Sequence, residues 1–362
     1  MTGRLERIRA IIAEQKLDAL MLTGEVSRFY ATGLRSSAGV ALFTPEKNVF
    51  ITDFRYIEAA RAKLGGSFTV EMSELARKQT KIVCEYLPRA KKIGVEGDVI
   101  TLRAADAWKK ELAENGLKGV KLIPAGAGVH ALRAVKEPRE LDAMRRAQQI
   151  AEHALEEVLR GFLRPGVTER AVCAELVYRM LKGGAEKVSF DPIVVSGANG
   201  SLPHGEPSGR VIERGDFVTI DIGCVTGGYC SDMTRTVAVG EATEEMRAVY
   251  GIVLEAQKAG IAAAKAGVAG KEIDAAARAV ITDAGYGAFF GHGFGHGLGL
   301  EIHEPPNASP SEERALPAGA VISAEPGIYL PGRFGVRIED VVVLTEGGCE
   351  NLTNAPKELR IL

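Results

Sequence analysis

The stretch GHGFGHGLGLEIHEPP, from Gly291 to Pro306, decides how this chain is organised. It sets His292, His296 and His303 among closely spaced glycines. Glycine at every second position makes a helix untenable, so the four-residue spacing of the first two histidines does not form a helical zinc-binding pair. We therefore predict extended backbone here, in which missing side chains let a metal ion or a substrate come close to the main chain.

Two pairs of carboxylates flank this stretch. Asp221 in TIDIG and Asp232 in YCSDMTRT precede it. Glu325 in SAEPGIY and Glu339 in GVRIED follow it. Four carboxylates and one imidazole, which we take to be His296, form a donor set suited to divalent cations such as manganese, cobalt or zinc.

Strand periodicity explains how the acids would meet. Asp221 alternates with isoleucines, which predicts a buried strand position, and a buried carboxylate without a partner is strongly destabilised. We expect the strand around Asp232 to pair with the strand of Asp221 as a hairpin across CVTGG. A dication bound between the two acids would remove their repulsion. The same argument applies to Glu325 and Glu339. Any one of these acids alone is explained as an ordinary ion-paired residue, but two pairs and a glycine-framed histidine favour a metal site.

The remaining histidines have less specific interpretations. His303 is expected near the metal ligands or facing a substrate. His204, in LPHGEP, is a candidate for donating a hydrogen bond to a substrate, although a lone histidine is more often structural. The role of His292 stays open. Cys224 and Cys230 lie close to the aspartates, but carboxylate sites for hard metals seldom include thiolates.

Composition limits the class of protein. The chain has 362 residues, of which 46% are hydrophobic and 25% charged, with a formal charge of -2. This length predicts two domains, and the charge gives no reason to expect nucleic acid or an anionic membrane as a partner. No secretory signal and no transmembrane segment is expected. Five scattered cysteines indicate reduced thiols and a cytoplasmic protein.

Residues 1–132 are predicted to form an α/β domain. Helical patterns at residues 5–16, 55–64, 78–87 and 101–115 alternate with strands at residues 17–24, 39–53, 68–72, 91–96 and 120–125. The segment TDFRY, from Thr52 to Tyr56, and Trp108 are the only features we single out, as a strand end with a salt bridge and a partly buried ring. A glycine-rich stretch near residue 132 marks the domain boundary.

Residues 133–362 are predicted to form an α+β domain with an internal pseudo-repeat. Two helices followed by strands occur twice, and each half supplies one pair of carboxylates. The helices are expected at residues 137–162, 168–183, 244–266 and 271–284. The strands are expected at residues 215–223, 228–240, 295–303, 321–328 and 335–344.

These motifs resemble the pita-bread (creatinase/aminopeptidase) metallopeptidases, most closely the Xaa-Pro dipeptidase (prolidase) and aminopeptidase P branch. The resemblance rests on SGANGSLPHGEP, TIDIGCVTGGYCSDMTRT, GHGFGHGLGLEIHEPP, SAEPGIYLPGRFGVRIED and the ending PKEL. In the first domain, TDFRYIEAA, IGVEGD and LRAVKEPRELDAMRRA are similar to the creatinase-type N-terminal domain and linker of that branch. The likeness spans nearly the whole chain.

The resemblance implies a centre with two divalent ions, manganese or cobalt in most of the family and zinc in some. Its ligands would be Asp221, Asp232, His296, Glu325 and Glu339, with Asp232 and Glu339 bridging both ions. It further implies that His204 and His303 are active-site histidines, that Arg337 lies near the substrate and Phe190 near a proline pocket, and that the protein is a homodimer.

The implied reaction is hydrolysis of the Xaa-Pro bond of a small peptide with proline at the second position. A hydroxide bridging the metals would attack the peptide carbonyl. Glu325 would move a proton to the leaving nitrogen, His303 would stabilise the oxyanion, and His204 would fix the substrate. The alternatives are an aminopeptidase of other specificity, such as a methionine aminopeptidase, a metal-free creatinase-type hydrolase, and a non-catalytic binding module.

Two small departures from the family pattern bear on substrate preference rather than on catalysis. Ser323 stands where the family often has threonine, and Gly200 and Ser201 replace a more usual Ser-Ala. The choice between dipeptidase and aminopeptidase, and the physiological metal, are not fixed by the sequence.

Overall fold

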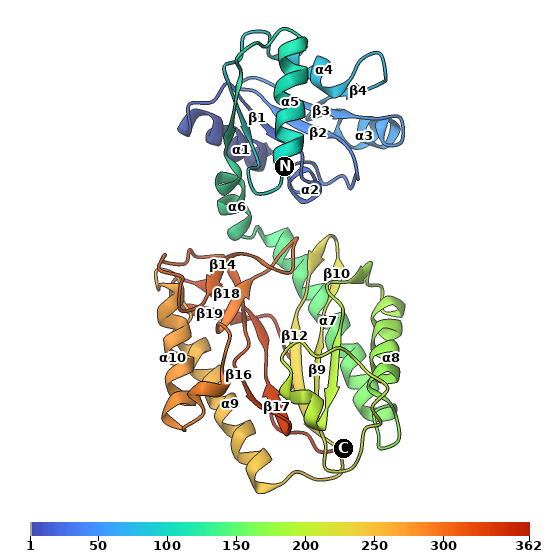
Figure 1. Cartoon of the computed structure of the whole chain (residues 1–362), viewed down its shortest axis with the longest axis vertical. Coiled ribbons are helices and arrows are strands. Elements are labelled where there is room, and N and C mark those ends of the chain that lie inside the picture. Colours follow the sequence, from blue (N-terminus) through green and yellow to red (C-terminus); the bar gives the residue numbers. More distant parts are fainter. Residues whose placement is uncertain (1) are drawn as a thin grey trace. The chain divides into compact units, whose positions relative to one another are not determined.

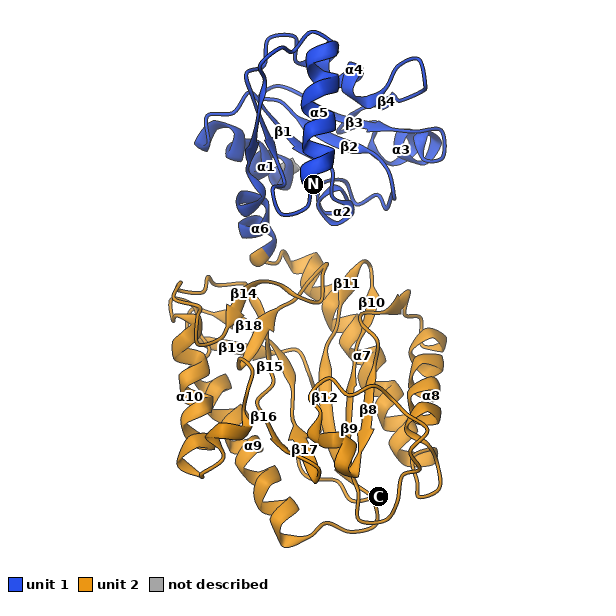
Figure 2. Cartoon of the chain, viewed as in Figure 1, with its two compact units in different colours: residues 1–133 blue, residues 134–362 orange. Residues whose placement is uncertain are grey.

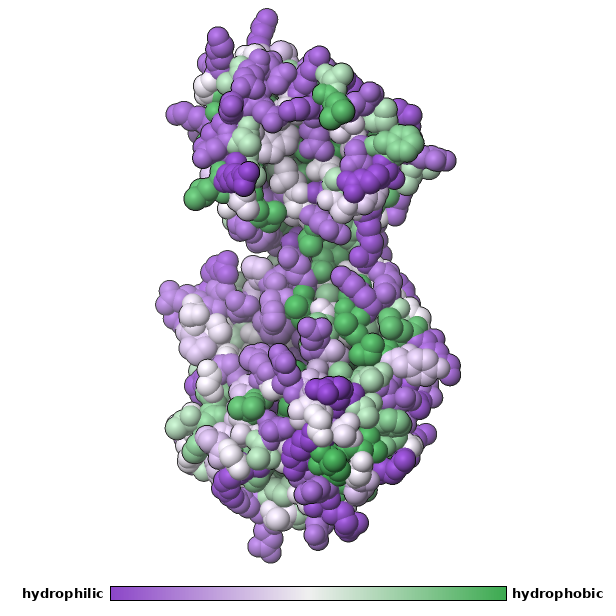
Figure 3. Space-filling view, turned by 45° about the vertical axis from the view of Figure 1, so that its right-hand side comes forward, coloured by the Kyte–Doolittle hydropathy of each residue, from purple (hydrophilic) through white to green (hydrophobic). Residues whose placement is uncertain are grey.

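The computed structural model describes residues 2–362. It divides the chain into two compact units, residues 1–133 and residues 134–362 (Figure 2). The face shown in Figure 3 is largely hydrophilic, with apolar side chains gathered in smaller patches. Among the described helices, none is long and apolar enough to cross a membrane. Each unit encloses its own apolar core.

Unit 1 is built on a six-stranded mixed sheet in the order β4-β3-β2-β1-β5-β6. The antiparallel central strands β1 (Ala19–Leu22) and β2 (Val40–Phe43) are buried along their whole length, which fits continuous apolar runs covered on both faces. The other strands are β3 (Asn48–Thr52), β4 (Thr69–Met72), β5 (Lys92–Val95) and β6 (Lys121–Pro124). The helices are α1 (Thr2–Glu14), α2 (Glu25–Thr32), α3 (Ile57–Leu64), α4 (Gln79–Tyr86), α5 (Leu102–Glu114) and α6 (Gly126–Ala134).

The expected α/β architecture of unit 1 is confirmed, but helices α2 and α6 were not predicted. The start of α2 depends on a distant residue, because the backbone N–H groups of Thr23 and Gly24 donate to Glu96 Oε2 at 2.7 and 2.8 Å. The α6 segment reads as a glycine-rich linker in the sequence. In the fold, Val129 is fully buried, and the bare α-carbon of Gly128 faces Ile11. Tertiary contacts override the local pattern in both places.

Unit 2 holds two helix pairs with strands between them (Figure 1). Helices α7 (Pro138–Gly161) and α8 (Glu169–Lys182) share a core with the sheet β12-β9-β8. Helices α9 (Glu244–Ala263) and α10 (Gly270–Asp283) share a core with strands β15 to β18. The order of two helices and then strands therefore occurs twice, as the α+β pseudo-repeat predicts.

The strands of unit 2 are short. Those of the first half are β7 (Lys187–Val188), β8 (Ile193–Ser196), β9 (Phe217–Ile222), β10 (Cys224–Thr226), β11 (Tyr229–Cys230) and β12 (Met233–Ala238). Those of the second half are β13 (Gly295–Gly297), β14 (Glu304–Ala308), β15 (Val321–Ala324), β16 (Gly327–Leu330), β17 (Phe334–Arg337), β18 (Asp340–Thr345) and β19 (Gly348–Asn351). Two short 3-10 turns lie at Gly197–Ser201 and Gly287–Phe289.

Local sequence sets the helix ends in unit 2. Glu137 caps α7 in a reciprocal capping box with Glu140, and Pro138 occupies the first turn. Thr168 caps α8 by accepting a hydrogen bond from the backbone N–H of Ala171 at 3.2 Å. The observed helices agree with the predicted spans to within a few residues.

The long predicted strands of unit 2 are broken, and this is a correction with a physical reason. The strands β9 and β12 pair as expected, with Asp221 opposite Thr234, but the predicted strand at residues 228–240 is interrupted before Met233. The predicted strands at residues 321–328 and 335–344 break after Ala324 and after Arg337. Asp232, Glu325 and Glu339 therefore lie at breaks between strands, and not within strands.

The glycines of the opening stretch serve a different purpose from the predicted one. A Cβ on Gly295 would lie 1.9 Å from the carbonyl oxygen of Ser323, and one on Gly297 would lie 2.2 Å from that of Glu304. The bare backbone thus lets neighbouring chain segments pack against it. The predicted strand at residues 295–303 ends at Gly297, and a bent loop follows up to Glu304.

Candidate active site

Three of the five predicted ligands form a compact group. The ligand-capable atoms of Asp232, His296 and Glu339 all lie within 4.8 Å of one another. His296 comes from β13, whereas the acids come from the breaks before β12 and before β18. The fold therefore brings together groups from both halves of the pseudo-repeat.

The other two predicted ligands border this group. His296 Nε2 lies 3.2 Å from Glu325 Oε1 and 3.5 Å from Asp232 Oδ2. Asp221, on β9, accepts a hydrogen bond from Arg337 Nη2 at 2.7 Å through its Oδ2 atom. It lies close enough to Asp232 to raise the pKa of that carboxyl group.

The acids of this cluster are buried and poorly compensated. Asp232 and Glu339 are 4% and 1% exposed. Burial, and after it the neighbouring carboxylates, raises the pKa of both groups well above the ordinary range. Burial also raises the pKa of Glu325 and lowers the pKa of His296, so that the imidazole is held neutral. The cluster favours loss of negative charge or gain of a cation.

The donor atoms fit a divalent cation. Asp221 Oδ1 is buried without a hydrogen-bond partner among the described residues. His296 Nδ1 lies 3.2 Å from the carbonyl oxygen of Gly297, which assigns the N–H to that atom and leaves the Nε2 lone pair facing carboxylate oxygens. A bound cation, or a proton on one of the acids, would satisfy a lone pair set against carboxylate oxygens. Oxygen ligands with one neutral imidazole suit manganese, cobalt or zinc.

Two hydroxyl groups hold the acids in place. Thr234 Oγ1 donates to Glu339 Oε2 at 2.7 Å, and Ser323 Oγ donates to Glu325 Oε1 at 2.9 Å. Sequence analysis missed both roles. The Ser323 contact is local, because Ser323 stands two residues before Glu325, whereas Thr234 meets Glu339 across 105 residues, which no local pattern reports.

Arg337 joins the cluster to several neighbouring protein groups. Besides Asp221, it donates to Thr234 Oγ1 at 3.1 Å, to Tyr329 Oη at 2.9 Å and to the carbonyl oxygen of Pro203 at 3.2 Å. It is 4% exposed. The structure thus shows Arg337 bonded to protein groups, and its predicted contact with a substrate stays a prediction.

Tyr329 connects Arg337 to His292. Tyr329 Oη lies 2.9 Å from His292 Nε2, and His292 Nδ1 lies 2.9 Å from the carbonyl oxygen of Gly293. The arginine donates to the phenol oxygen, so the phenol donates in turn to His292 Nε2. Burial lowers the pKa of His292. His292, whose role the sequence left open, is thereby a neutral member of this hydrogen-bonded chain.

Comparison with known proteins shows the family of the chain. Residues 142–346 match the model of metallopeptidase family M24, and residues 4–135 match the creatinase/prolidase N-terminal domain. An Xaa-Pro dipeptidase of Pyrococcus furiosus is 36% identical over 361 residues, covering 99% of this chain and 100% of the relative. The chain belongs to metallopeptidase family M24.

Solved structures place the fold in the prolidase and aminopeptidase P branch of that family. An Xaa-Pro dipeptidase from Bacillus anthracis superposes with a TM-score of 0.93 at 42% identity, covering 100% of this chain and 99% of that one. An X-Pro aminopeptidase from Thermotoga maritima gives 0.90 at 37% identity, covering 99% and 100%. The predicted family and pita-bread fold are therefore confirmed, and the protein is a metallopeptidase.

The other predicted site residues of this M24 peptidase are His303, His204 and Phe190. His303 is exposed, and its ring lies 4.3 Å from that of His296, centroid to centroid. His204 is exposed and acts electrostatically on both His292 and His303. Phe190 is half-buried in the bend after β7. The substrate-binding roles of His204 and Phe190 stay predictions.

A second set of bonds fixes the backbone of Glu339. Its N–H donates to the carbonyl oxygen of Thr234 at 3.1 Å, and its carbonyl oxygen accepts from Arg235 Nη1 at 2.6 Å. Arg235 also pairs with the fully buried Asp340 at 2.8 Å. Asp340 receives a further bond from Lys357 at 2.7 Å. In contrast to the ligand acids, Asp340 has a lowered pKa, because these cations outweigh its burial.

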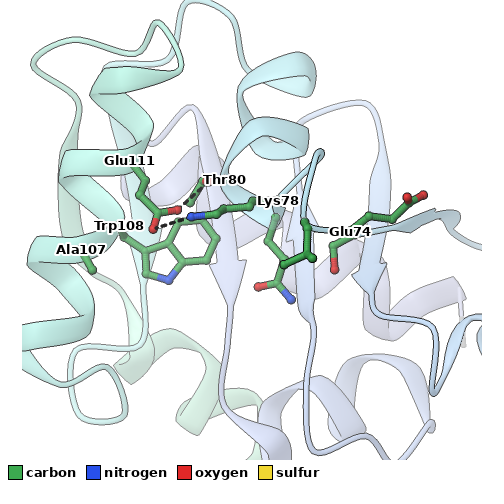
Figure 4. A pocket seen from close by; sticks show the side chains of 9 residues that line it. Glu74, Lys78, Thr80, Ala107, Trp108 and Glu111 are labelled. Carbon is green, nitrogen blue, oxygen red and sulfur yellow. Dashed lines mark hydrogen bonds and ion pairs between the residues drawn. The ribbon is translucent and has the colours of Figure 1, made fainter.

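Unit 1 contains a hollow of about 450 Å³ that is distinct from this cluster. Figure 4 shows Trp108 beside Lys78 and Glu111, with Thr80 donating to Glu111 Oε2 at 2.9 Å. Trp108 is half-buried, and Arg55 pairs with Asp53 at 2.7 Å. The partly buried ring and the strand-end salt bridge expected in unit 1 are both present.

Proposed function

We propose that this M24 metallopeptidase hydrolyses the Xaa-Pro bond of small peptides with proline at the second position, using two divalent cations. The observation that carries the proposal is the buried cluster of four carboxylates around the neutral His296. Among the described residues, Asp221 is the only one of these acids that pairs with an arginine or lysine. The names of the Pyrococcus furiosus and Bacillus anthracis relatives support the choice of substrate.

The ligand roles follow from the positions of the side chains. Asp221, Asp232, His296, Glu325 and Glu339 would hold the two cations, with the shared ligands Asp232 and Glu339 taken from the family pattern. His296 lies beside Glu325, and Asp221 lies beside Arg337. Manganese or cobalt best fits the oxygen-rich set, with zinc possible. When bound, such ions act as Lewis acids that make water nucleophilic near neutral pH.

The protein groups supply proton transfer and orientation. Glu325 takes a proton from the attacking water and passes it to the leaving proline nitrogen, as a general acid–base group beside His296. His303, exposed beside His296, donates a hydrogen bond to the oxygen that becomes negative, and His204 holds the substrate. Proline lacks an amide N–H, so a site with no acceptor for that group favours an Xaa-Pro bond.

The assay that tests this function measures bound metals and hydrolysis of Xaa-Pro and Xaa-Pro-Yaa peptides. We expect activity that chelator treatment abolishes and manganese or cobalt restores. Asp232→Ala and Glu339→Ala should each lower kcat/KM on the order of 10³-fold, as does removal of a group acting directly on the transition state. Glu346→Ala is the control, because Glu346 is an exposed acid in the turn after β18.

The same assay separates the alternatives. Full activity in chelator-treated protein would indicate a metal-free hydrolase. Metal binding without hydrolysis would indicate a binding module, and cleavage of peptides that lack proline would indicate another specificity. The relative rates on dipeptides and tripeptides decide between dipeptidase and aminopeptidase.

We also propose a cytoplasmic homodimer. All five cysteines are unpaired, which fits a reducing compartment. The dimer rests on resemblance to the family, and sedimentation analysis of the purified protein tests it.

A further inference from the structure

A buried ion pair joins the start of unit 2 to the loop that carries His303. Lys136 Nζ lies 2.9 Å from Glu304 Oε1, and the two side chains are 1% and 3% exposed. Lys136 is the third residue of unit 2, and its backbone N–H donates to the carbonyl oxygen of Gly319 at 2.9 Å. The chain that leaves unit 1 is thereby tied to the residue directly after His303.

The surroundings are shaped to admit this pair. A Cβ on Gly299 would lie 2.5 Å from Glu304 Oε1 and 3.0 Å from Lys136 Cε. Any larger residue at position 299 would have to displace the ion pair. The carbonyl oxygen of Gly299 accepts a bond from the backbone N–H of Cys230 at 2.7 Å, two residues before Asp232. The loop is therefore fastened next to a proposed metal ligand as well.

Glu304 also closes the loop between two histidines. Gly297 and Glu304 are antiparallel partners, so residues 298–303 form the loop between them. His296 directly precedes the first partner and His303 directly precedes the second, and their rings lie 4.3 Å apart. The position of Glu304 consequently sets where the exposed His303 ring stands over the cluster.

We propose that Lys136 and Glu304 are positioning residues that fix His303 for its contact with the substrate. The inference rests on the proposed function, in which His303 stabilises the oxygen that becomes negative. Neither residue touches the substrate, so their effect passes through the backbone of the loop. An interaction formed chiefly in the transition state changes kcat more than KM.

The test removes both partners together. Removing one partner of a buried ion pair alone can destabilise the protein more than replacing both partners, so both are changed in the same variant. We expect Lys136→Met/Glu304→Gln to lower kcat by about 10- to 100-fold, the range seen for groups that orient a ligand or catalytic residue. The amount of bound metal, the KM and the Tm should stay close to the values of the unchanged protein.

The control is another ion pair of unit 2. Arg210 pairs with Asp216 at 2.6 Å, and this pair holds Ser196 on β8 and not the His303 loop. Arg210→Met/Asp216→Asn should leave kcat within about twofold of the unchanged protein. An equal fall in kcat for both double variants would overturn the proposal, because it would show a general loss of order.

A double-mutant cycle with His303→Ala gives the decisive readout. If the ion pair acts through His303, then Lys136→Met/Glu304→Gln has no further effect on kcat once His303 is alanine. Effects that multiply would overturn the proposal, since the pair would then act by another route.

A second measurement separates this inference from the proposed function. If the unchanged protein does not cleave Xaa-Pro peptides, the proposed function fails, but the position of His303 can still be followed by imidazole NMR signals assigned with His303→Ala. We expect Lys136→Met/Glu304→Gln to shift the His303 signals and the control pair to leave them in place. Unshifted signals in the first variant would overturn the positioning role.

Discussion

Two acids of unit 1 and two acids of the cluster in unit 2 behave in opposite ways. In unit 1, Glu71 and Glu85 both bond to Arg77, at 2.8 and 2.5 Å, and the arginine lowers the pKa of each acid. In unit 2, burial and neighbouring carboxylates raise the pKa of Asp232 and Glu339. Carboxylates are thus stabilised as anions beside Arg77 and destabilised as anions in the cluster of unit 2.

The difference between these two groups of acids marks the candidate metal centre. Paired surface acids contribute modestly to stability and need nothing further. Buried acids facing one another carry an electrostatic cost that a bound cation would remove. Unit 2 also contains the counterexample Asp340, which is buried but compensated by Arg235 and Lys357. The lack of a compensating basic group therefore marks the candidate centre, more than burial alone.

The largest expected effect comes from neutralising one acid of the cluster without changing its size. Asp232→Asn should abolish bound metal and hydrolysis, because it removes a charged ligand. The same change should raise the Tm of the metal-free protein, since it relieves repulsion among buried carboxylates. We expect a gain of a few degrees, as about 1 kcal/mol moves the Tm of a domain of this size by about 2–4 °C.

Calorimetry of metal-free and metal-loaded Asp232→Asn checks this prediction. A metal-free variant less stable than the unchanged metal-free protein would show that Asp232 is compensated by protein groups, and would break the contrast between the two units.

An intermediate effect is expected from pH on the stability gained when the protein binds metal. Because Asp232 and Glu339 have raised pKa values, the folded metal-free protein binds more protons than the unfolded chain at pH values above the ordinary 3.8 and 4.5 of these groups. Their contribution to stability is present at low pH and is lost as pH rises through the raised pKa values. The gain in Tm on adding manganese should therefore grow from about pH 5 to about pH 8. Thermal scans at fixed ionic strength measure it, and a gain that shrinks with pH would contradict the assignment.

The smallest effect is expected in unit 1. Glu71→Gln removes a partly exposed partner of Arg77 and should cost roughly 0.2–1 kcal/mol of unfolding free energy. The pKa of Glu71 is lowered, so this contribution is present at neutral pH and fades as pH falls towards the lowered value. Urea unfolding at two pH values tests it, with peptidase activity at neutral pH expected to stay unchanged. A loss of bound metal in this variant would show that Glu71 of unit 1 affects the metal site of unit 2, which would contradict the contrast between the two units.

Local pattern predicted the helices of unit 2 well. Thr168 and Pro138 act in the first few residues of a helix, so the information lies beside the structure that it determines. The strand breaks at Asp232, Glu325 and Glu339 were not predicted. The sheet partner changes at each break: β11 pairs with β10 and β12 with β9, while β16 and β17 pair with each other and β15 pairs with β18.

The supporting contacts were equally out of reach. Thr234 meets Glu339 across 105 residues, and Lys136 meets Glu304 across 168. No short-range pattern predicts such a pairing, because the identity of a threonine or a lysine does not indicate which distant residue it will contact in the fold.

The sequence by itself determined the helices of unit 2, the family resemblance and the residue types that a metal centre needs, because helix caps and motif spacing are local properties. Only the tertiary structure decided which atoms face one another: that Asp221 Oδ1 lacks a partner, that Arg337 binds protein groups, and that glycines 295 and 297 admit neighbouring backbone. The physical reason is that desolvation and Coulomb interaction depend on distance in space, and the fold sets those distances between residues far apart in the chain.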